Sequence, residues 1–384
     1  MNAAQSGLYV DQLTVTWRNG HTALRDASFS VPRGSIAALV GVNGSGKSTL
    51  FKALMGFVRV GHGEIAILGQ PVNRALRQNL VAYVPQSEEV DWSFPVLVED
   101  VVMMGRYGHM GWLRRAKPRD REIVDAALAR VGMSEYRHRQ IGELSGGQKK
   151  RVFLARAIAQ QGQVILLDEP LSNLDAKLRA SMRIRISDLH KQLKKSGKPA
   201  TTVYVTHDQT EAMTMGDRIC VMKLGHIMQV DTPDNLYHQP KNMFVAGFIG
   251  APEMNIRPSQ LVEHGGRLYL TLGDQRLPLN DRLQSKVETH KNQQVFFGVR
   301  PEFVSLSDEP FAEGSCAGEM VRVENMGHEF FVYLRVADYE LTARVPSDDA
   351  KPMIAKGLNR KVYFTFDLNK CHIFDAKTEQ NLSL

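Results

Sequence analysis

Residues 41–49, Gly-Val-Asn-Gly-Ser-Gly-Lys-Ser-Thr, constrain the fold of this chain more than any other segment. They follow an apolar run at 35–40, which has the character of a buried strand. They precede apolar positions at helical spacing, Leu50, Leu54 and Phe57. A strand, a glycine-rich loop and a helix in this order are the context that confirms a phosphate-binding P-loop.

The chemistry of this loop predicts a role for its side chains and its backbone. The glycines let backbone N–H groups turn towards phosphate oxygens, and the helix adds its positive end. Lys47 should bridge the β- and γ-phosphates of ATP, and the Ser48 hydroxyl should ligate Mg²⁺. The other residues expected to contact the nucleotide are Gly41, Asn43, Gly44, Ser45, Gly46 and Thr49.

Two carboxylates follow a second apolar strand, residues 164–167. Asp168 ends this strand, where its carboxylate can reach the Mg²⁺ coordination sphere. Glu169 is placed to polarise the attacking water. Phosphoryl transfer needs mainly positioning and charge neutralisation, so one base, one metal and several hydrogen-bond donors suffice.

A second anion-binding motif lies between these two segments. Leu144 is followed by four residues that open a helix with the apolar face Val152, Ala155 and Ile158. Small residues at a helix N-terminus make an anion site. The residues of this motif that are expected to contact a nucleotide are Ser145, Gly146, Gly147 and Gln148.

The pattern of apolar residues and prolines along the chain predicts two domains joined by a connector. Buried strands alternate with helices up to residue 235, and the helical part covers about 87–160. Residues 236–255 carry prolines and short helical patches and are interpreted as the connector. From 256 to 384 short strands at even spacing predict a small all-β barrel.

Composition is ordinary for a globular protein, with a net charge of +7 and a pI of about 9.2. The three cysteines are too few and too scattered for a disulfide framework or a zinc site, so a reducing cytoplasm fits. The first residues lack the pattern of a signal peptide, and no apolar run is long enough to span a bilayer. Work at a membrane would therefore need a partner.

The order and spacing of these motifs resemble those of ATP-binding cassette (ABC) ATPases. The resemblance implies an α/β P-loop NTPase fold with a helical subdomain, followed by an OB-like barrel called the TOBE domain. It also implies that two subunits sandwich two ATP molecules, each P-loop facing the signature, Ser145 to Gln148, of the other subunit.

Four more site residues follow from this resemblance alone. Gln86 matches the Q-loop glutamine, which contacts Mg²⁺ or water, and His207 matches the switch histidine, which hydrogen-bonds the γ-phosphate. Asp175 matches the D-loop that crosses the dimer seam. Trp17 matches the aromatic residue that stacks on adenine, although a core tryptophan is an alternative at this position.

The resemblance has two parts. Residues 1–165 look like the ATPases of manganese, iron and zinc importers, through segments 43–49, 83–94, 101–108 and 148–151. Residues 171–384 look like the ATPases of multiple-sugar, maltose and glycerol-phosphate importers, through segments 171–179, 204–212, 248–252, 298–302 and 366–370. The change falls near Asp168, in a motif that both groups share.

The resulting hypothesis is an ATPase subunit that powers solute import. A carbohydrate is favoured because the TOBE domain is the rarer feature, and a manganese, iron or zinc importer is the alternative. The resemblance implies permease subunits, a substrate-binding protein and an ATP-bound homodimer at the cytoplasmic face of the membrane. No nucleic acid is expected, and a soluble ABC ATPase acting on nucleic acid or ribosomes is the alternative from another class. The basic stretch 106–121 fits either a permease or lipid contact or a solvated surface.

Overall fold

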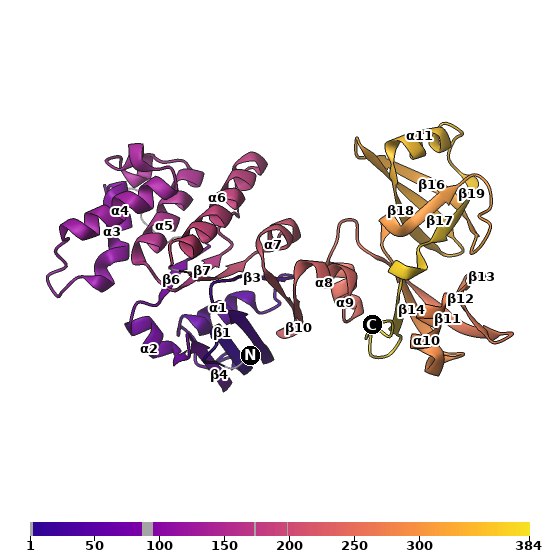
Figure 1. Cartoon of the computed structure of the whole chain (residues 1–384), viewed down its shortest axis with the longest axis horizontal. Helices are drawn as coiled ribbons and strands as arrows, with labels where there is room; N and C mark the ends of the chain where they lie inside the picture. Colours follow the sequence, from indigo (N-terminus) through magenta and orange to yellow (C-terminus); the bar gives the residue numbers. More distant parts are fainter. Residues whose placement is uncertain (1–2, 87–94, 173, 198) are drawn as a thin grey trace. The chain divides into compact units, whose positions relative to one another are not determined.

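The computed structural model describes residues 3–86, 95–172, 174–197 and 199–384. The chain divides into two compact units, Met1–Pro233 and Asp234–Leu384 (Figure 1). The segment interpreted as a connector, 236–255, belongs to the second unit. It contains the helix α9 (Met243–Phe248) and the end of α8 (Pro233–His238). None of the helices described combines the length and apolar character that a membrane crossing requires.

A six-stranded sheet forms the centre of the first unit. Its order is β10-β9-β3-β8-β7-β6, and all neighbours are parallel except β10 and β9. The strands are β3 (Ile36–Gly41), β6 (Val81–Val84), β7 (Val164–Asp168), β8 (Thr201–Val205), β9 (Arg218–Lys223) and β10 (His226–Asp231). Every residue of β3 and β8 is buried, as expected for parallel strands covered on both faces.

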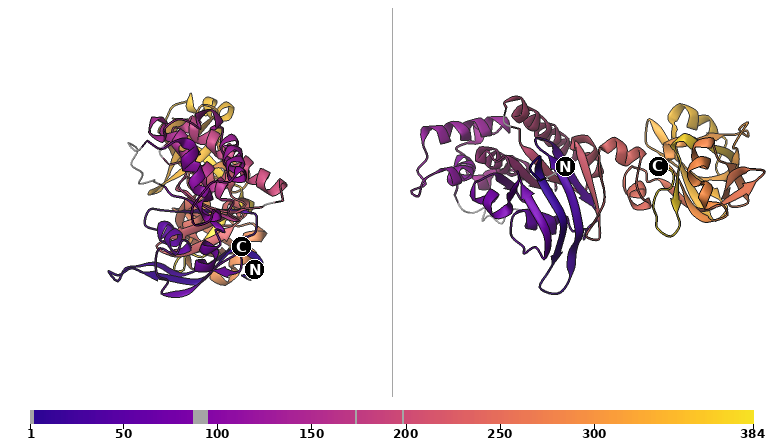
Figure 2. Two further views of the ribbon diagram at one scale, coloured as in Figure 1. Left: turned by 90° about the vertical axis from the view of Figure 1, so that its left-hand side faces the viewer. Right: turned by 60° about the horizontal axis from the view of Figure 1, so that its bottom comes forward.

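An antiparallel sheet near the N-terminus has the order β2-β1-β4-β5. Its strands are β1 (Ser6–Thr16), β2 (Thr22–Pro32), β4 (His62–Ile67) and β5 (Gln70–Pro71), followed by helix α2 (Val72–Arg77). Figure 2 shows the long indigo strands running side by side. Helix α1 (Lys47–Leu54) buries Leu50, Phe51 and Leu54 in the core that this sheet shares with β3.

Helices make up the rest of the first unit. They are α3 (Val98–Met103), α4 (Pro118–Arg130), α5 (Gly146–Gln160), α6 (Ala176–Lys195) and α7 (Gln209–Met215). Three 3₁₀ turns, at 104–109, 134–136 and 141–143, connect some of them. Helices α3 and α4 both pack on α5, and this confirms a helical subdomain in the fold. Residues 87–94, the start of the predicted helical part, lie outside the described residues.

One residue of the basic stretch departs from both interpretations of that stretch. Arg106 is buried, and its Nε donates to Asp120 Oδ1 on α4 at 3.0 Å. Its Nη1 donates to the carbonyl oxygen of Ala159 at the end of α5. Arg106 therefore ties three elements together and is not a surface charge. Trp112 and Arg115, in contrast, are exposed.

The second unit consists mainly of two antiparallel sheets, which confirms the all-β fold predicted for this part. One has the order β13-β12-β11-β14-β20 and the other β15-β19-β16-β17-β18. The strands are β11 (Asn255–His264), β12 (Arg267–Leu272), β13 (Gln275–Pro278), β14 (Gln294–Val299), β15 (Val304–Ser307), β16 (Cys316–Asn325), β17 (Glu329–Val336), β18 (Tyr339–Pro346), β19 (Arg360–Phe366) and β20 (His372–Asp375). Helices α10 (Asp281–Val287) and α11 (Ser347–Ile354) complete it, with 3₁₀ turns at 288–290, 301–303 and 368–370.

The first prediction concerns the buried ion pair of the helical subdomain. Asp120→Asn removes the charge that balances Arg106 and should lower the free energy of unfolding by about 3 kcal/mol, because an unpaired charge then stays buried. Urea denaturation followed by circular dichroism measures the loss. Asp125→Asn on the same helix is the matched control. Asp125 pairs with Arg137 but is half exposed, so the change should stay below about 1 kcal/mol. Equal losses in the two variants would contradict the prediction.

The pKa of Asp120 gives the sign of the pH dependence. Burial alone would raise it, but hydrogen bonds from the Lys117 backbone and from Arg106 bring it below its usual value. The stabilisation by this carboxylate is therefore present above the pKa that it has in the unfolded chain, and it is lost as the pH falls through the lower folded value.

Candidate active site

The P-loop joins β3 to α1, as the sequence predicts. Gly44 and Gly46 have φ values of 79° and 101°, a backbone region that favours glycine. Space also requires glycine at position 46, since a Cβ there would lie 2.7 Å from the carbonyl oxygen of Ala23. The N-cap residue of α1 is Gly46, which has no side chain to cap the helix. This leaves the cap position open to a phosphate, as an anion site at a helix N-terminus needs.

The turn between β9 and β10 supports the P-loop from outside. The N–H of Gly225 donates to the carbonyl oxygen of Ser45 at 3.0 Å, and the Gly225 carbonyl oxygen accepts from the N–H of Arg25. Gly225 has a φ of 84°, and a Cβ there would lie 2.7 Å from the carbonyl oxygen of Ala23. The hairpin thus fixes the path of the loop through backbone hydrogen bonds.

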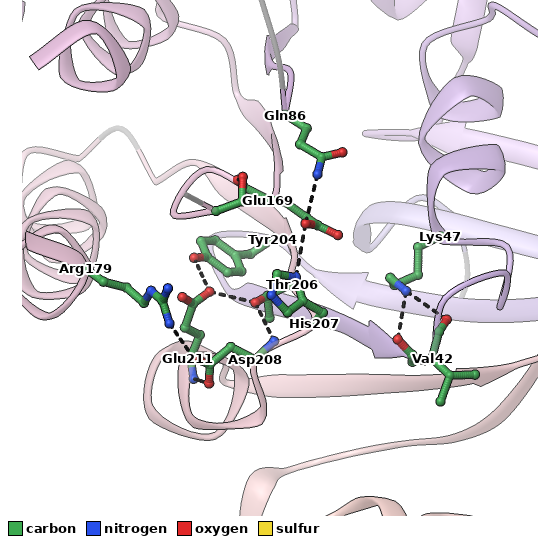
Figure 3. Close-up of polar contacts among 12 residues, drawn as sticks. Val42, Lys47, Gln86, Glu169, Arg179, Tyr204, Thr206, His207, Asp208 and Glu211 are labelled. Atoms are coloured by element: carbon green, nitrogen blue, oxygen red, sulfur yellow. Dashed lines mark hydrogen bonds and ion pairs between the residues drawn. The ribbon is translucent and has the colours of Figure 1, made fainter. Parts of the chain in front are cut away.

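Lys47 lies folded against the loop that precedes it. Its Nζ donates to the carbonyl oxygens of Gly41 at 2.8 Å and Val42 at 3.1 Å (Figure 3). Burial lowers the pKa of Lys47, while the carboxylates of Glu169 and Asp168 oppose this change. The ammonium group is therefore buried among neutral oxygens, with two carboxylates near enough to act on it.

The two adjacent carboxylates differ in surroundings. Burial raises the pKa of Asp168, the charge of Glu169 raises it further, and a hydrogen bond from the Tyr83 hydroxyl opposes the rise. Glu169 has a φ of 44°, which is rare outside glycine, and its N–H donates to the carbonyl oxygen of Val205. Non-glycine residues held in this region often occur at functional sites.

Three segments that lie far apart in the sequence meet at Glu169. Its Oε2 accepts a hydrogen bond from Gln86 Nε2 at 3.1 Å and another from His207 Nδ1 at 3.1 Å (Figure 3). The Glu169 side chain is 16% exposed and that of His207 is 58% exposed, so solvent reaches the pair from the His207 side. The structure thus brings together three of the residues predicted for hydrolysis.

A buried polar network behind His207 is a feature that sequence reasoning missed. Glu211 Oε2 accepts from the hydroxyls of Tyr204 at 2.8 Å and Thr206 at 2.6 Å (Figure 3). Glu211 is buried, and burial together with its charge raises the pKa of Tyr204. Asp208 N-caps α7 by accepting from the N–H groups of Thr210 and Glu211. The sequence did contain one signal for this region: Asp208 is followed three positions later by Glu211, a spacing typical of a helix N-terminus with a capping residue.

The signature motif begins helix α5. The Ser145 hydroxyl accepts from the N–H of Gln148, and Gln148 Oε1 accepts from the N–H of Ser145 at 2.9 Å, forming a reciprocal capping box. Gly147 is close to Leu178 on α6, which leaves no room for a Cβ. A cavity of about 320 Å³ lies between this motif and the segment around Gln86.

Two further predicted residues have local roles in the structure. Asp175 caps α6, and its Oδ1 accepts from the N–H of Leu178 at 2.9 Å. Trp17 follows β1 and is half-buried, outside the core of buried residues. Its ring lies 5.5 Å from Nζ of Lys52 on α1, so it is near the helix that starts at the P-loop.

Comparison with known proteins identifies the family. The model described as ABC transporter matches residues 24–172, the MalK OB fold domain matches 250–304 and the TOBE domain matches 297–374. The multiple sugar-binding transport ATP-binding protein MsmK of Streptococcus mutans is 36% identical, covering 94% of this chain and 95% of that protein. The chain belongs to the ABC transporter family. It is an importer ATPase that binds nucleotide, and such subunits work with membrane permeases.

Proteins of iron and manganese transport systems also match this ABC protein. The chelated iron transport protein YfeB of Yersinia pestis is 62% identical over 170 residues, which is 44% of this chain and 57% of YfeB. The chain thus spans little more than half of that relative. The manganese transport protein MntA of Synechocystis is 50% identical over 59% of this chain and 84% of its own length. Both halves of the predicted resemblance are confirmed.

Solved structures confirm the fold of the ABC protein. cbiO1 of Clostridium perfringens, part of the ABC transporter complex cbiONQ, aligns with a TM-score of 0.54 and 27% identity. The alignment covers 61% of this chain and 92% of cbiO1. The ADP conformation of the ATP-binding cassette MJ1267 aligns with a TM-score of 0.53 at 21% identity, a likeness of fold alone.

The second prediction concerns the network behind His207. Glu211→Gln keeps the shape of the side chain but replaces one acceptor oxygen by an NH₂ group, so the hydroxyls of Tyr204 and Thr206 lose part of their support. We expect ATP turnover to fall about tenfold while nucleotide affinity stays within about twofold, because the loss acts through the position of His207. Steady-state hydrolysis and fluorescent-nucleotide titration measure the two quantities. Glu64→Gln, an exposed position, is the control. A loss of affinity equal to the loss of turnover would count against a positioning role.

Proposed function

We propose that this chain hydrolyses ATP to power the import of a carbohydrate through a membrane permease, at the cytoplasmic face of the membrane. The observation that carries the proposal is the C-terminal barrel, which matches the MalK OB fold and TOBE models. The trehalose/maltose import protein MalK of Thermococcus litoralis supports it, with 38% identity over 93% of this chain and 94% of its own length.

The geometry at Glu169 supports the proposed role of this residue as the group that polarises the attacking water. Gln86 and His207 each donate one hydrogen bond to the same carboxylate oxygen, which leaves Oε1 for a water molecule. Two donors on one oxygen also restrict the rotation of the carboxylate. We assign His207 a second role, donation to the γ-phosphate through Nε2, which the imidazole can perform together with the Nδ1 bond to Glu169 when both ring nitrogens carry a proton. We assign Lys47 the bridge between the β- and γ-phosphates.

The residues around Asp168 fit a magnesium ion. Mg²⁺ prefers oxygen ligands and is usually held by one or two protein groups together with substrate phosphates. The Asp168 carboxylate, the Ser48 hydroxyl and the amide oxygen of Gln86 are ligands of this kind. Burial raises the pKa of Asp168 and the neighbouring charge of Glu169 raises it further, and a divalent cation would stabilise the ionised carboxylate against both effects. When bound, the ion would neutralise charge that develops on the phosphate oxygens.

Nucleotide contacts are proposed for the remaining predicted residues. Gly41, Asn43, Gly44, Ser45, Gly46 and Thr49 would surround the phosphates, and Trp17 would stack on adenine. Ser145, Gly146, Gly147 and Gln148 would contact the ATP of a second copy, with Asp175 at the seam of an ATP-bound homodimer. The side chains of Ser145 and Gln148 already cap α5. The phosphate would therefore be bound by the backbone N–H groups at the N-terminus of this helix that the capping box leaves free. A substrate-binding protein would complete the transporter.

A metal-ion importer is the second candidate function. The observation that favours it is the 62% identity to YfeB over 170 residues, well above the identity to MsmK. The segment between Gln86 and the signature docks on the permease in this family. This segment lies within residues 1–165, the part that resembles the ATPases of metal importers. The carbohydrate proposal is preferred because the sugar-importer relatives match nearly the whole chain, including the barrel.

The third prediction tests the catalytic carboxylate. Glu169→Gln should retain ATP binding and lose about 10²–10⁴-fold in turnover, because the amide cannot accept a proton from water. Single-turnover hydrolysis and nucleotide titration distinguish the two effects. Glu143→Gln, an exposed glutamate of the first unit, is the matched control and should keep full turnover. Turnover near that of the unmodified protein in Glu169→Gln would remove this residue from the role.

The fourth prediction tests the substrate class. The chain is co-expressed with a sugar permease or with a manganese permease in cells that lack their own importer ATPases. ATP-dependent uptake of labelled sugar or of ⁵⁴Mn²⁺ is then measured. We expect sugar uptake that disappears in Glu169→Gln. Uptake of manganese alone would establish the second candidate, and ATP turnover without uptake through either permease would overturn both.

A further inference from the structure

A cavity of about 380 Å³ lies within the second unit, and its lining includes none of the residues assigned to nucleotide chemistry. Its walls come from the end of α8, from α10, from the segment after β14, from the start of β20 and from the last residues of the chain. Cationic or ionisable nitrogen side chains dominate the polar part of this lining, namely His238, Arg282, Arg300, Lys370 and His372. Aspartate and glutamate are absent from the lining as the structure describes it.

The two arginines are held firmly by neutral acceptors. Arg300 is 2% exposed, and it donates to the carbonyl oxygens of Tyr237 and Ile249. Arg282 donates to the carbonyl oxygens of Leu368, Cys371 and Ser383. Within the described residues, neither guanidinium group forms an ion pair with a carboxylate. These hydrogen bonds fix the orientation of both guanidinium groups, but no ion pair among the described residues neutralises their charge.

The lining residues Arg282 and His372 each have a nitrogen whose hydrogen bonding bears on what the cavity can hold. Arg282 Nε is buried and has no hydrogen-bond partner among the described residues, although an unpaired buried donor costs free energy. His372 is 6% exposed, and its Nδ1 accepts from the Asn381 amide at 3.2 Å. The neutral ring therefore carries its proton on Nε2, which is a second donor.

The charges act on His372 in the way expected of a cationic cavity. Burial lowers its pKa to about 4, and the charges of Arg300, Arg282 and His238 contribute to the decrease. Two carboxylates outside the lining contact residues of the lining: Glu302 accepts from the Tyr237 hydroxyl, and Asp234 lies 3.6 Å from His238 at an exposed position. Lys286, which is not part of the lining, donates from Nζ to the main-chain oxygen of the lining residue Leu384.

We propose that this cavity, which we call the barrel pocket, binds a small organic phosphate through Arg282, Lys370 and His372. A phosphate group supplies several acceptor oxygens and the negative charge that the guanidinium groups lack. The volume exceeds that of a bare phosphate ion and falls in the range of small-molecule sites. The aromatic rings of Tyr237 and Phe303 and the amides of Gln239 and Asn369 supply surfaces for the organic part.

The test uses the full-length protein with glucose 6-phosphate, inorganic phosphate, sulfate and glucose as probes in isothermal titration. We expect glucose 6-phosphate to bind and glucose to give no signal. Lys370→Gln and Arg282→Gln should each weaken binding about tenfold or more, as when one charge-assisted hydrogen bond is lost. Lys351→Gln, an exposed lysine on α11 outside the barrel pocket, should leave the affinity unchanged.

Further arms separate the barrel pocket from the nucleotide site and identify the source of the phosphate. Lys47→Ala should not affect glucose 6-phosphate binding, and this arm keeps the result independent of the proposed function. Equal affinity for inorganic phosphate would retain the anion site but overturn the organic ligand. Because Arg282 also holds three backbone carbonyl oxygens, thermal denaturation is used to check that the Arg282→Gln variant is folded. Lys370 is exposed, so Lys370→Gln still tests the proposal if Arg282→Gln unfolds.

His372 gives a readout that a structural role would not produce. A bound dianion stabilises the imidazolium form, so the pKa of His372 should rise from about 4 when glucose 6-phosphate binds. Long-range ¹H–¹⁵N NMR spectra of histidine measure this change directly. The proposal is overturned by absence of binding at millimolar glucose 6-phosphate, by binding that survives both Lys370→Gln and Arg282→Gln, or by a His372 pKa that does not move.

Discussion

The register of the parallel strands decides where the chemistry of this protein can occur. Val205 at the end of β8 lies opposite Asp168 of β7 on one side and Leu39 of β3 on the other. On the far side of β7, Val84 of β6 pairs with Leu167. These strands therefore end at one level, and the segments that follow them carry Gln86, Glu169, His207 and the P-loop to the same edge. A shift of one residue in any pair would separate groups that now share hydrogen bonds.

Sequence reasoning predicted the residues at this edge but not what supports them. The glycine-rich loop, the carboxylates after β7 and the strands β12 and β17 have strong local patterns, so they could be recognised without tertiary information. Glu211 and Arg106 could not, because each has meaning only through partners such as Tyr204 and Asp120 that the fold brings near. The pairing of strands such as β16 and β20 could not be predicted either, since their partners are nonlocal and their apolar alternation is weak.

Segments that resemble the two kinds of importer ATPase are interleaved in the first unit. Strands β3 and β6 belong to the part that resembles metal importers, β7 leads into the motif that both groups share, and β8 and β9 belong to the part that resembles sugar importers. All five pair in one sheet. Lys150 of α5 donates to Ser172 just beyond the shared motif. The join is thus a continuous hydrogen-bonded structure, and the side chains that hold Glu169 are drawn from both parts.

The hydrogen bond from Gly225 to Ser45 has a thermodynamic consequence. Because the hairpin turn holds the P-loop through backbone atoms, the backbone path of the loop is set before a ligand binds, whereas the Lys47 side chain would leave its carbonyl acceptors to reach a phosphate. Little conformational entropy then remains to be lost when phosphate enters. The amide of Gly225, which donates to the Ser45 carbonyl oxygen, should accordingly exchange hydrogen slowly even before nucleotide arrives, with protection set by the stability of the β9–β10 hairpin rather than by ligand concentration.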